Sequence, residues 1–225
     1  MTQLHSSAIA WFFSTLNQLL RQPRAFLANT TWMELKVERL IAFAFVCLCI
    51  GVGGQTVVEL SLAKYSMNTM IHDPQTFAKL SELLSLPPGE AGFATIIERL
   101  SAYRIEKWIT LVFLPISAYF TLYLLAGALW VMCRFSLLYK DTYDHILRAV
   151  ALAQAPMIFA VIPVVGPLIS FILSIRLLSI ALGTLHKSYG FQRVLAVITS
   201  QIMVKSMWAF AIGLLAQAYI AESKL

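Results

Sequence analysis

Arg176 and Lys205 are cations within long apolar stretches, and of all the residues they are the most capable of unusual chemistry. Arg176 is 11 residues from Lys187, and Lys205 is 12 residues from Arg193. If both stretches are membrane helices with inner ends at Lys187 and Arg193, a rise of about 1.5 Å per residue places both cations roughly 16–18 Å deep. A cation at that depth costs about 2.5–3.5 kcal/mol on insertion scales. We therefore expect each of the two charges to have a neutralising partner.

The sequence offers no acid near these two cations. No carboxylate occurs between Asp144 and Glu222, and residues 145–225 contribute +5 of the net charge of +6 (six basic residues and one acidic). Three interpretations follow: the side chains snorkel or pair with backbone carbonyls, they line an anion or lipid-headgroup cavity, or an acid comes from another protein. Arginine suits bidentate phosphate contact better than lysine does. The uncharged candidate partners are Gln154, Gln201 and the carbonyls freed near Pro156.

The remaining reactive residue types show no catalytic or metal-binding pattern. The three cysteines lie in apolar runs without CxxC spacing, and the four histidines are scattered, which indicates neither a disulfide framework nor a zinc site. Paired catalytic carboxylates and a Gly-rich phosphate loop are also missing from the sequence. We therefore expect a protein that is not an enzyme, with no cofactor. Because the basic residues are spread along apolar segments, nucleic acid is not an expected partner.

The composition shows which elements must position these residues. The 225 residues are 59% hydrophobic and 12% charged, with a mean hydropathy of +0.76. Soluble domains have about 25% charged residues, so a water-soluble globular domain is excluded. The sequence predicts an all-α polytopic membrane protein, because a spanning helix needs about 20 apolar residues. The five predicted spans cover about 39–60, 108–133, 145–162, 168–186 and 194–221.

The first 30 residues are predicted to form an amphipathic segment in the membrane interface, ahead of a five-helix transmembrane domain over 31–225. Apolar residues recur at helical spacing over 8–20, a stretch too short to span. Trp11, Arg21 and Arg24 are the expected interface anchors. Thr31 and Glu34 fit a capping box that would begin the first span.

Two connections between the spans carry specific predictions. Residues 63–104 are predicted to be an outer loop with two short interfacial helices, over 77–84 and 93–100. Pro156 breaks the third predicted span, and a charge-free turn with Pro163, Gly166 and Pro167 follows. The third and fourth segments either cross the membrane fully or form a shallow re-entrant hairpin.

The distribution of basic residues predicts the orientation. With the N-terminus inside, the inner segments hold nine Lys and Arg, and the outer segments hold six over a longer polar chain. The positive-inside rule therefore favours a cytoplasmic N-terminus. An odd number of spans places the C-terminus on the opposite side.

Short motifs in the second half resemble the core of the YIP1 family. They are the Ala-rich run Arg148–Pro156, the turn Ile162–Pro167 and the segment Lys187–Gly190, and Gln22–Phe26 resembles the stretch before the first span of bacterial members. The resemblance covers about residues 18–220. It implies five transmembrane helices, a cytoplasmic N-terminus and a non-enzymatic protein of the bacterial inner membrane. The GTPase binding of eukaryotic relatives is not implied, because their long N-terminal region has no counterpart here.

The sequence thus leads to two hypotheses of different classes. The first is a scaffold, assembly or membrane-organising protein in the lipid bilayer that associates with a membrane protein partner or with a second copy. The second is a small transporter or lipid-handling protein, in which Arg176 and Lys205 line an intramembrane site for an anion such as an anionic lipid.

Overall fold

A computed structural model describes residues 8–72, 82, 90–136, 142–185 and 190–222. Every regular element in these ranges is a helix, and five helices are long and apolar enough to cross a membrane. The predicted all-α, five-helix architecture is therefore confirmed. The five candidate spans are Val37–Ser66, Thr95–Phe135, Tyr143–Val161, Val165–Leu185 and Gly190–Ala211.

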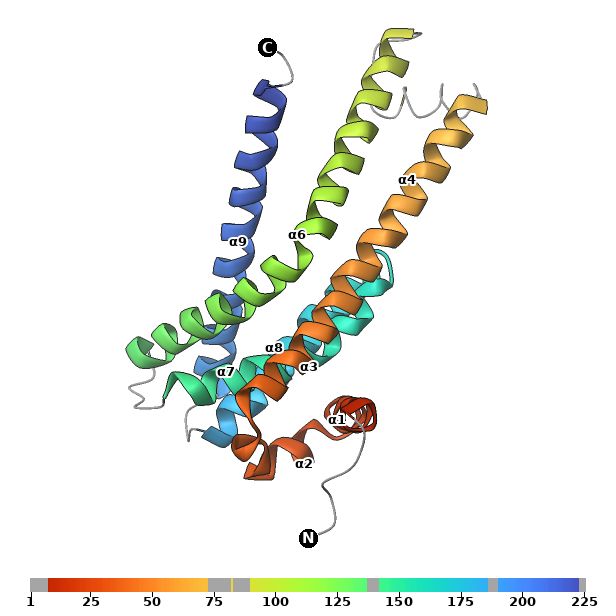
Figure 1. Cartoon of the computed structure of the whole chain (residues 1–225). Coiled ribbons are helices and arrows are strands. Elements are labelled where there is room, and N and C mark those ends of the chain that lie inside the picture. Colours follow the sequence, from red (N-terminus) through yellow and green to blue (C-terminus); the bar gives the residue numbers. More distant parts are fainter. Residues whose placement is uncertain (1–7, 73–81, 83–89, 137–141, 186–189, 223–225) are drawn as a thin grey trace.

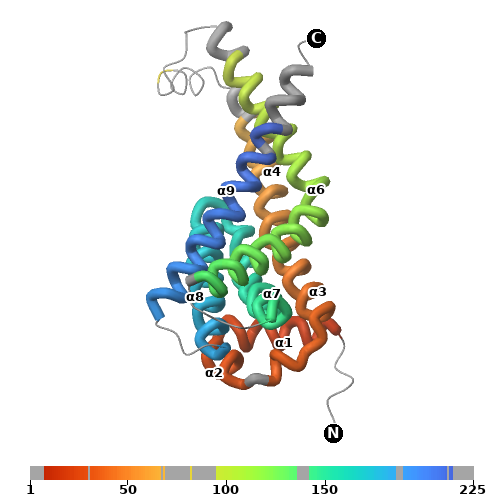
Figure 2. Tube along the Cα trace, turned by 90° about the vertical axis from the view of Figure 1, so that its left-hand side faces the viewer, coloured from red at the N-terminus to blue at the C-terminus, as the bar shows by residue number. Residues whose placement is uncertain are grey.

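Three long helical segments run along the bundle, and a shorter hairpin packs among them at the lower end in Figure 1. The long segments are α3 (Val37–Leu48) with its continuation α4 (Gly54–His72), α6 (Glu90–Ser136) and α9 (Gly190–Glu222). The hairpin consists of α7 (Tyr143–Leu152), the 3₁₀ helix η3 (Ala155–Val161) and α8 (Val165–Leu185). Figure 2 shows that α4, α6 and α9 continue well beyond the tip of this hairpin.

Helix α1 (Ala8–Arg21) lies across the lower end of the bundle, far from the last turns of α9. Its inner face packs on α3, where the rings of Trp11 and Phe12 contact Phe43 with centroid separations of 6.0 and 5.1 Å. Its outer face leaves Ile9 and Phe13 exposed. The helix therefore presents apolar side chains outward at the base of the spans, and its location in the membrane interface stays a prediction.

The predicted capping box at Thr31 is wrong. The 3₁₀ helix η1 (Thr30–Glu34) forms there, and its N-cap is Asn29, whose side chain accepts a hydrogen bond from the Thr31 amide at 3.4 Å. The buried Trp32 indole N–H donates to the Leu27 carbonyl at 3.0 Å, which closes this turn on the short helix α2 (Pro23–Ala28). The first spanning helix therefore begins only at Val37, after an extended link.

The guanidinium of Arg148 joins this N-terminal segment to the hairpin. It donates to the backbone carbonyls of Met33 and Leu35 and, through Nε, to the Asp144 carboxylate at 2.8 Å. Arg148 thus stands one turn along α7 from Asp144 and holds residues more than 110 positions away in sequence.

The glycines of the first span allow the hairpin to approach closely, as expected for small residues in membrane helices. A Cβ on Gly51 would lie 1.9 Å from the Met157 carbonyl oxygen, and one on Gly54 would lie 2.7 Å from a methyl group of Val161. Gly51 lies in the π-helical turn η2 (Cys49–Gly53), which links α3 to α4. Backbone contact with η3 therefore requires glycine at position 51.

The described parts of the predicted outer loop over 63–104 are helical. Helix α4 continues to His72, and α6 begins at Glu90 and runs for 47 residues without interruption. The separate interfacial helix predicted over 93–100 is therefore wrong, because no breaker separates this stretch from the span and its helical period continues into it. The one predicted over 77–84 lies outside the described residues except for Glu82. Pro115 is the proline inside α6, which bends part-way along its length in Figure 1.

The predicted helix-breaking residues shape the hairpin. α7 ends at Leu152, and Pro156 is the second residue of the 3₁₀ helix. Val164 then has a φ of 66°, a conformation that strains a β-branched residue, and the Val165 amide donates to the Pro163 carbonyl at 2.7 Å. A Cβ on Gly166 would lie 2.1 Å from the Phe159 carbonyl oxygen, so the return of the chain also requires glycine. Pro167 lies in the first turn of α8, where its missing N–H is tolerated.

Candidate functional site

Arg176 lies on the outer face of α8, among apolar side chains that no other part of the described chain covers. Leu168 and Ile172, on the same side of the helix, are 60% and 55% exposed. Arg176 is itself exposed, and within the described residues it forms no ion pair or hydrogen bond. It stands nine residues before Leu185 and 11 after Val165, which is about 14–17 Å from either end of α8 by helix rise.

Lys205 faces a different environment, at the contact between α9 and α8. Its ammonium lies 4.3 Å from the centroid of the Phe171 ring. Further down the same contact, the Arg193 guanidinium occupies the space beside Gly183. These two contacts fix the antiparallel register of α8 and α9, and the Lys205 charge gains a cation–π interaction within the chain.

The structure does not bring Arg176 and Lys205 into one site. Arg176 follows Phe171 by five positions, which is roughly 140° around the helix and about 7.5 Å along it. The two cations therefore lie at different depths and on different sides of α8. A single anion site shared by both, one of the two hypotheses from the sequence, has no geometric basis within one chain.

The two glutamines of the predicted set also take separate positions. Gln154 is buried, and its side-chain amide donates to the Val150 carbonyl at 3.2 Å. It thereby satisfies the carbonyl left free where α7 ends. Gln201 is buried on α9, one helical turn before Lys205. Of the two glutamines, it is therefore the one that lies next to one of the two cations along the same helix.

A polar cluster between α4 and α6 was not predicted from the sequence. The Lys107 ammonium lies 2.7 Å from a carboxylate oxygen of Glu59, and both side chains are 21% exposed. The same carboxylate accepts hydrogen bonds from the Gln55 amide at 2.7 Å and the Tyr103 hydroxyl at 3.0 Å. The available signal was the i, i+4 spacing of Gln55 with Glu59 and of Tyr103 with Lys107, which places each pair on one helix face.

We expect a measurable coupling between Glu59 and Lys107. Glu59→Gln and Lys107→Met should each destabilise the protein by about 1–2 kcal/mol, and the double variant should cost less than the sum by about 1 kcal/mol, because each single change leaves a partly buried charge alone. Unfolding in mixed detergent micelles, followed by circular dichroism, measures the cycle. Lys64→Met is the control, since Lys64 is an exposed lysine of α4. Additive effects of the two substitutions would contradict the coupling.

The three predicted interface anchors lie at the lower end of the bundle. Trp11 is half-buried against α3, and the Arg39 guanidinium lies 4.2 Å from the centroid of its ring. Arg21 and Arg24 are exposed, at the end of α1 and in α2. Trp11 therefore fixes α1 to the first span, and the two arginines are the residues free to meet lipid headgroups.

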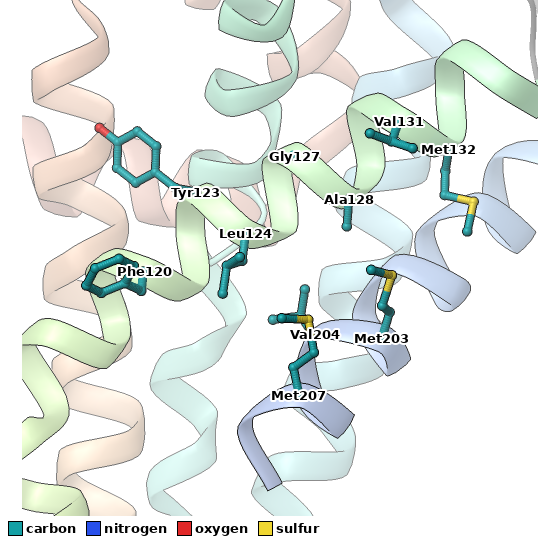
Figure 3. Close-up of a pocket in the computed structure, with 10 residues that line it drawn as sticks. All are labelled: Phe120, Tyr123, Leu124, Gly127, Ala128, Val131, Met132, Met203, Val204 and Met207. Atoms are coloured by element: carbon teal, nitrogen blue, oxygen red, sulfur yellow. The ribbon is translucent and has the colours of Figure 1, made fainter. Parts of the chain in front are cut away.

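An apolar groove of about 390 Å³ lies between α6 and α9 (Figure 3). Its lining includes Leu124, Gly127 and Ala128 of α6 and Met203, Val204 and Met207 of α9. Nothing in its lining suggests a reaction. Among the residues that the structure describes, no three His, Cys, Asp or Glu side chains are placed to hold a metal ion.

Comparison with known protein families, curated proteins and solved structures finds no match to this chain. The resemblance to the YIP1 family therefore rests on the short apolar motifs alone.

Proposed function

We propose that this protein is a non-enzymatic assembly protein of the bacterial cytoplasmic membrane, which binds a transmembrane helix of another protein through the outer face of α8. The single observation behind the proposal is Arg176, a cation near the middle of a candidate span, on an exposed apolar face and without a partner in the described chain.

An acid from another protein is the partner that suits this position best. Among the described residues no carboxylate pairs with Arg176, and Glu59 and Asp144 already pair with Lys107 and Arg148. In lipid, Arg176 costs about 2.5–3.5 kcal/mol on insertion scales. A carboxylate from a partner helix would offset this cost with a bidentate contact, and Leu168 and Ile172 would pack against the same helix.

The basic residues at the lower end support a cytoplasmic N-terminus. Arg21, Arg24 and Lys36 are exposed there, and Arg134 is in the last turn of α6, whose C-terminal end lies at the same end of the bundle in Figure 1. By the positive-inside rule, this end faces the cytoplasm. The partner helix would then meet Arg176 from within the bilayer.

Association with model transmembrane peptides tests the proposal. Protein labelled at its N-terminus would be reconstituted in phosphatidylcholine vesicles with acceptor-labelled polyleucine peptides that carry Asp, Asn or Leu at the centre. We expect energy transfer with the Asp peptide at about tenfold lower peptide density than with the Leu peptide, which corresponds to about 1.4 kcal/mol.

Variants of the two intramembrane cations provide the matched comparison. Arg176→Leu should abolish the preference for the Asp peptide, whereas Lys205→Leu should keep it, because Lys205 faces Phe171 within the chain. Equal association of the Asp and Leu peptides with the wild-type protein would refute the proposal. So would an Arg176→Leu variant that still prefers Asp.

A further inference from the structure

The groove between α6 and α9 lies within two candidate spans, so the medium around it is lipid hydrocarbon. Its walls are made of apolar side chains, and Met132, Met203 and Met207 supply flexible thioethers that adapt to the shape of a ligand (Figure 3). Such a wall suits a flexible apolar chain rather than a polar solute.

Gly127 keeps the middle of this groove open. A Cβ at this position would meet no atom within 4 Å, in contrast to Gly51 and Gly166, where backbone atoms exclude a side chain. A glycine inside a helix costs about 1 kcal/mol relative to alanine. Gly127 therefore leaves space in the groove that the described chain does not fill and that a ligand could occupy.

A cation stands at the lower end of the same helix face. Gly127, Val131 and Arg134 follow one another at i, i+4 and i+7, which places them on one side of α6. Arg134 lies about 10 Å beyond Gly127 by helix rise, in the last turn of α6. It is exposed, its guanidinium lies 5.2 Å from the Trp130 ring centroid, and no described acid pairs with it. Tryptophan beside a basic residue is typical of the headgroup level.

We propose that this groove binds an anionic phospholipid, with one acyl chain along Gly127 and Ala128 and the phosphate on Arg134. The guanidinium matches a phosphate with two parallel hydrogen bonds, and the groove leads away from it into the apolar layer. The charge at the groove's end favours a lipid over a partner helix, because an apolar helix has no group to satisfy Arg134. This inference is independent of the outer face of α8.

Lipid retention measured by native mass spectrometry tests the site. The purified full-length protein in mild detergent would be mixed with equal amounts of phosphatidylglycerol and phosphatidylcholine that carry the same acyl chains. We expect the wild-type protein to retain phosphatidylglycerol about fivefold over phosphatidylcholine, the ratio that one cation near a membrane surface provides.

Two variants separate the headgroup contact from the groove. Arg134→Gln should bring the ratio of the two lipids close to one, whereas Arg99→Gln, which changes an exposed arginine near the other end of α6, should leave it unchanged. Gly127→Leu should reduce retention of both lipids, because its side chain would extend into the groove from a position where a Cβ meets no protein atom within 4 Å. Gly213→Leu is the matched control, since Gly213 also faces open space in a helix but is not part of the groove lining.

Each alternative outcome is distinguishable. Unchanged lipid retention in Gly127→Leu would overturn the placement of the acyl chain, and an unchanged ratio in Arg134→Gln would overturn the phosphate contact. A wild-type dimer that Gly127→Leu converts to a monomer, with no retained lipid in either, would show that the groove binds a second helix instead.

Discussion

Replacing Gly51 with alanine is expected to destabilise the protein by about 3 kcal/mol, at the upper end of the usual cost of overpacking. The added Cβ would lie 1.9 Å from the Met157 carbonyl oxygen and 2.6 Å from its carbonyl carbon. These are backbone atoms, so no rotamer change relieves the clash, and the first span must move away from η3. Reversible unfolding in mixed detergent micelles, followed by circular dichroism, measures the loss.

The control for this prediction is Gly213→Ala. Gly213 also lies inside a long helix, but a Cβ there meets no atom within 4 Å. Alanine at this position should leave stability unchanged or raise it by up to about 1 kcal/mol through helix propensity. If both alanine variants unfolded at the same detergent composition, the close approach of the first span to the hairpin would be refuted.

The five-helix architecture could be predicted because the bilayer imposes a simple length requirement. Each span needs about 20 apolar residues, and charged or proline-rich segments mark where such runs end. Pro163 and Gly166 lie between the third and fourth predicted spans, where the structure has its tight turn. Local sequence determines features of this kind, so a single sequence reveals them.

The boundaries of helices outside the apolar runs were less predictable. The stretch over 93–100 has polar and apolar residues at helical spacing, and the sequence does not show whether such a helix ends before the span or continues into it. In the structure it continues, and its buried Ile96 belongs to the same helix, α6. At residue 31 the nearby Asn29 competes as a cap, and the folded turn around Trp32 favours it.

The candidate site depended most on tertiary contacts. Depths for Arg176 and Lys205 were counted from the ends of their spans, which treats the two helices as level. The contact of Lys205 with Phe171 fixes their actual offset. The ion pair of Glu59 with Lys107 joins residues on different helices, and only the packing of α4 on α6 brings them together.

Arg148→Met is expected to destabilise the protein by about 3 kcal/mol and to loosen the N-terminal segment locally. The substitution removes the charged donor from the carbonyls of Met33 and Leu35 and leaves the Asp144 carboxylate without its ion pair. Hydrogen bonds to a charged group contribute about 1.5–3 kcal/mol each. The two carbonyls and the carboxylate would also be left without a partner that offsets the cost of removing them from water. Hydrogen exchange of the amides over 30–36 should accelerate by about 100-fold, as a loss of this size implies.

The controls separate this local clamp from general charge loss. Arg24→Met removes an exposed arginine at the same end of the bundle and should leave exchange over 30–36 unchanged. Asp144→Asn removes the negative charge of one partner but keeps an acceptor oxygen, and should cost about 1 kcal/mol or less. Because α1 is also held by the rings of Trp11 and Phe12 on Phe43, it should remain protected in Arg148→Met. Equal acceleration in α1 and over 30–36 would contradict two independent attachments and indicate that the whole N-terminal segment is released as one unit.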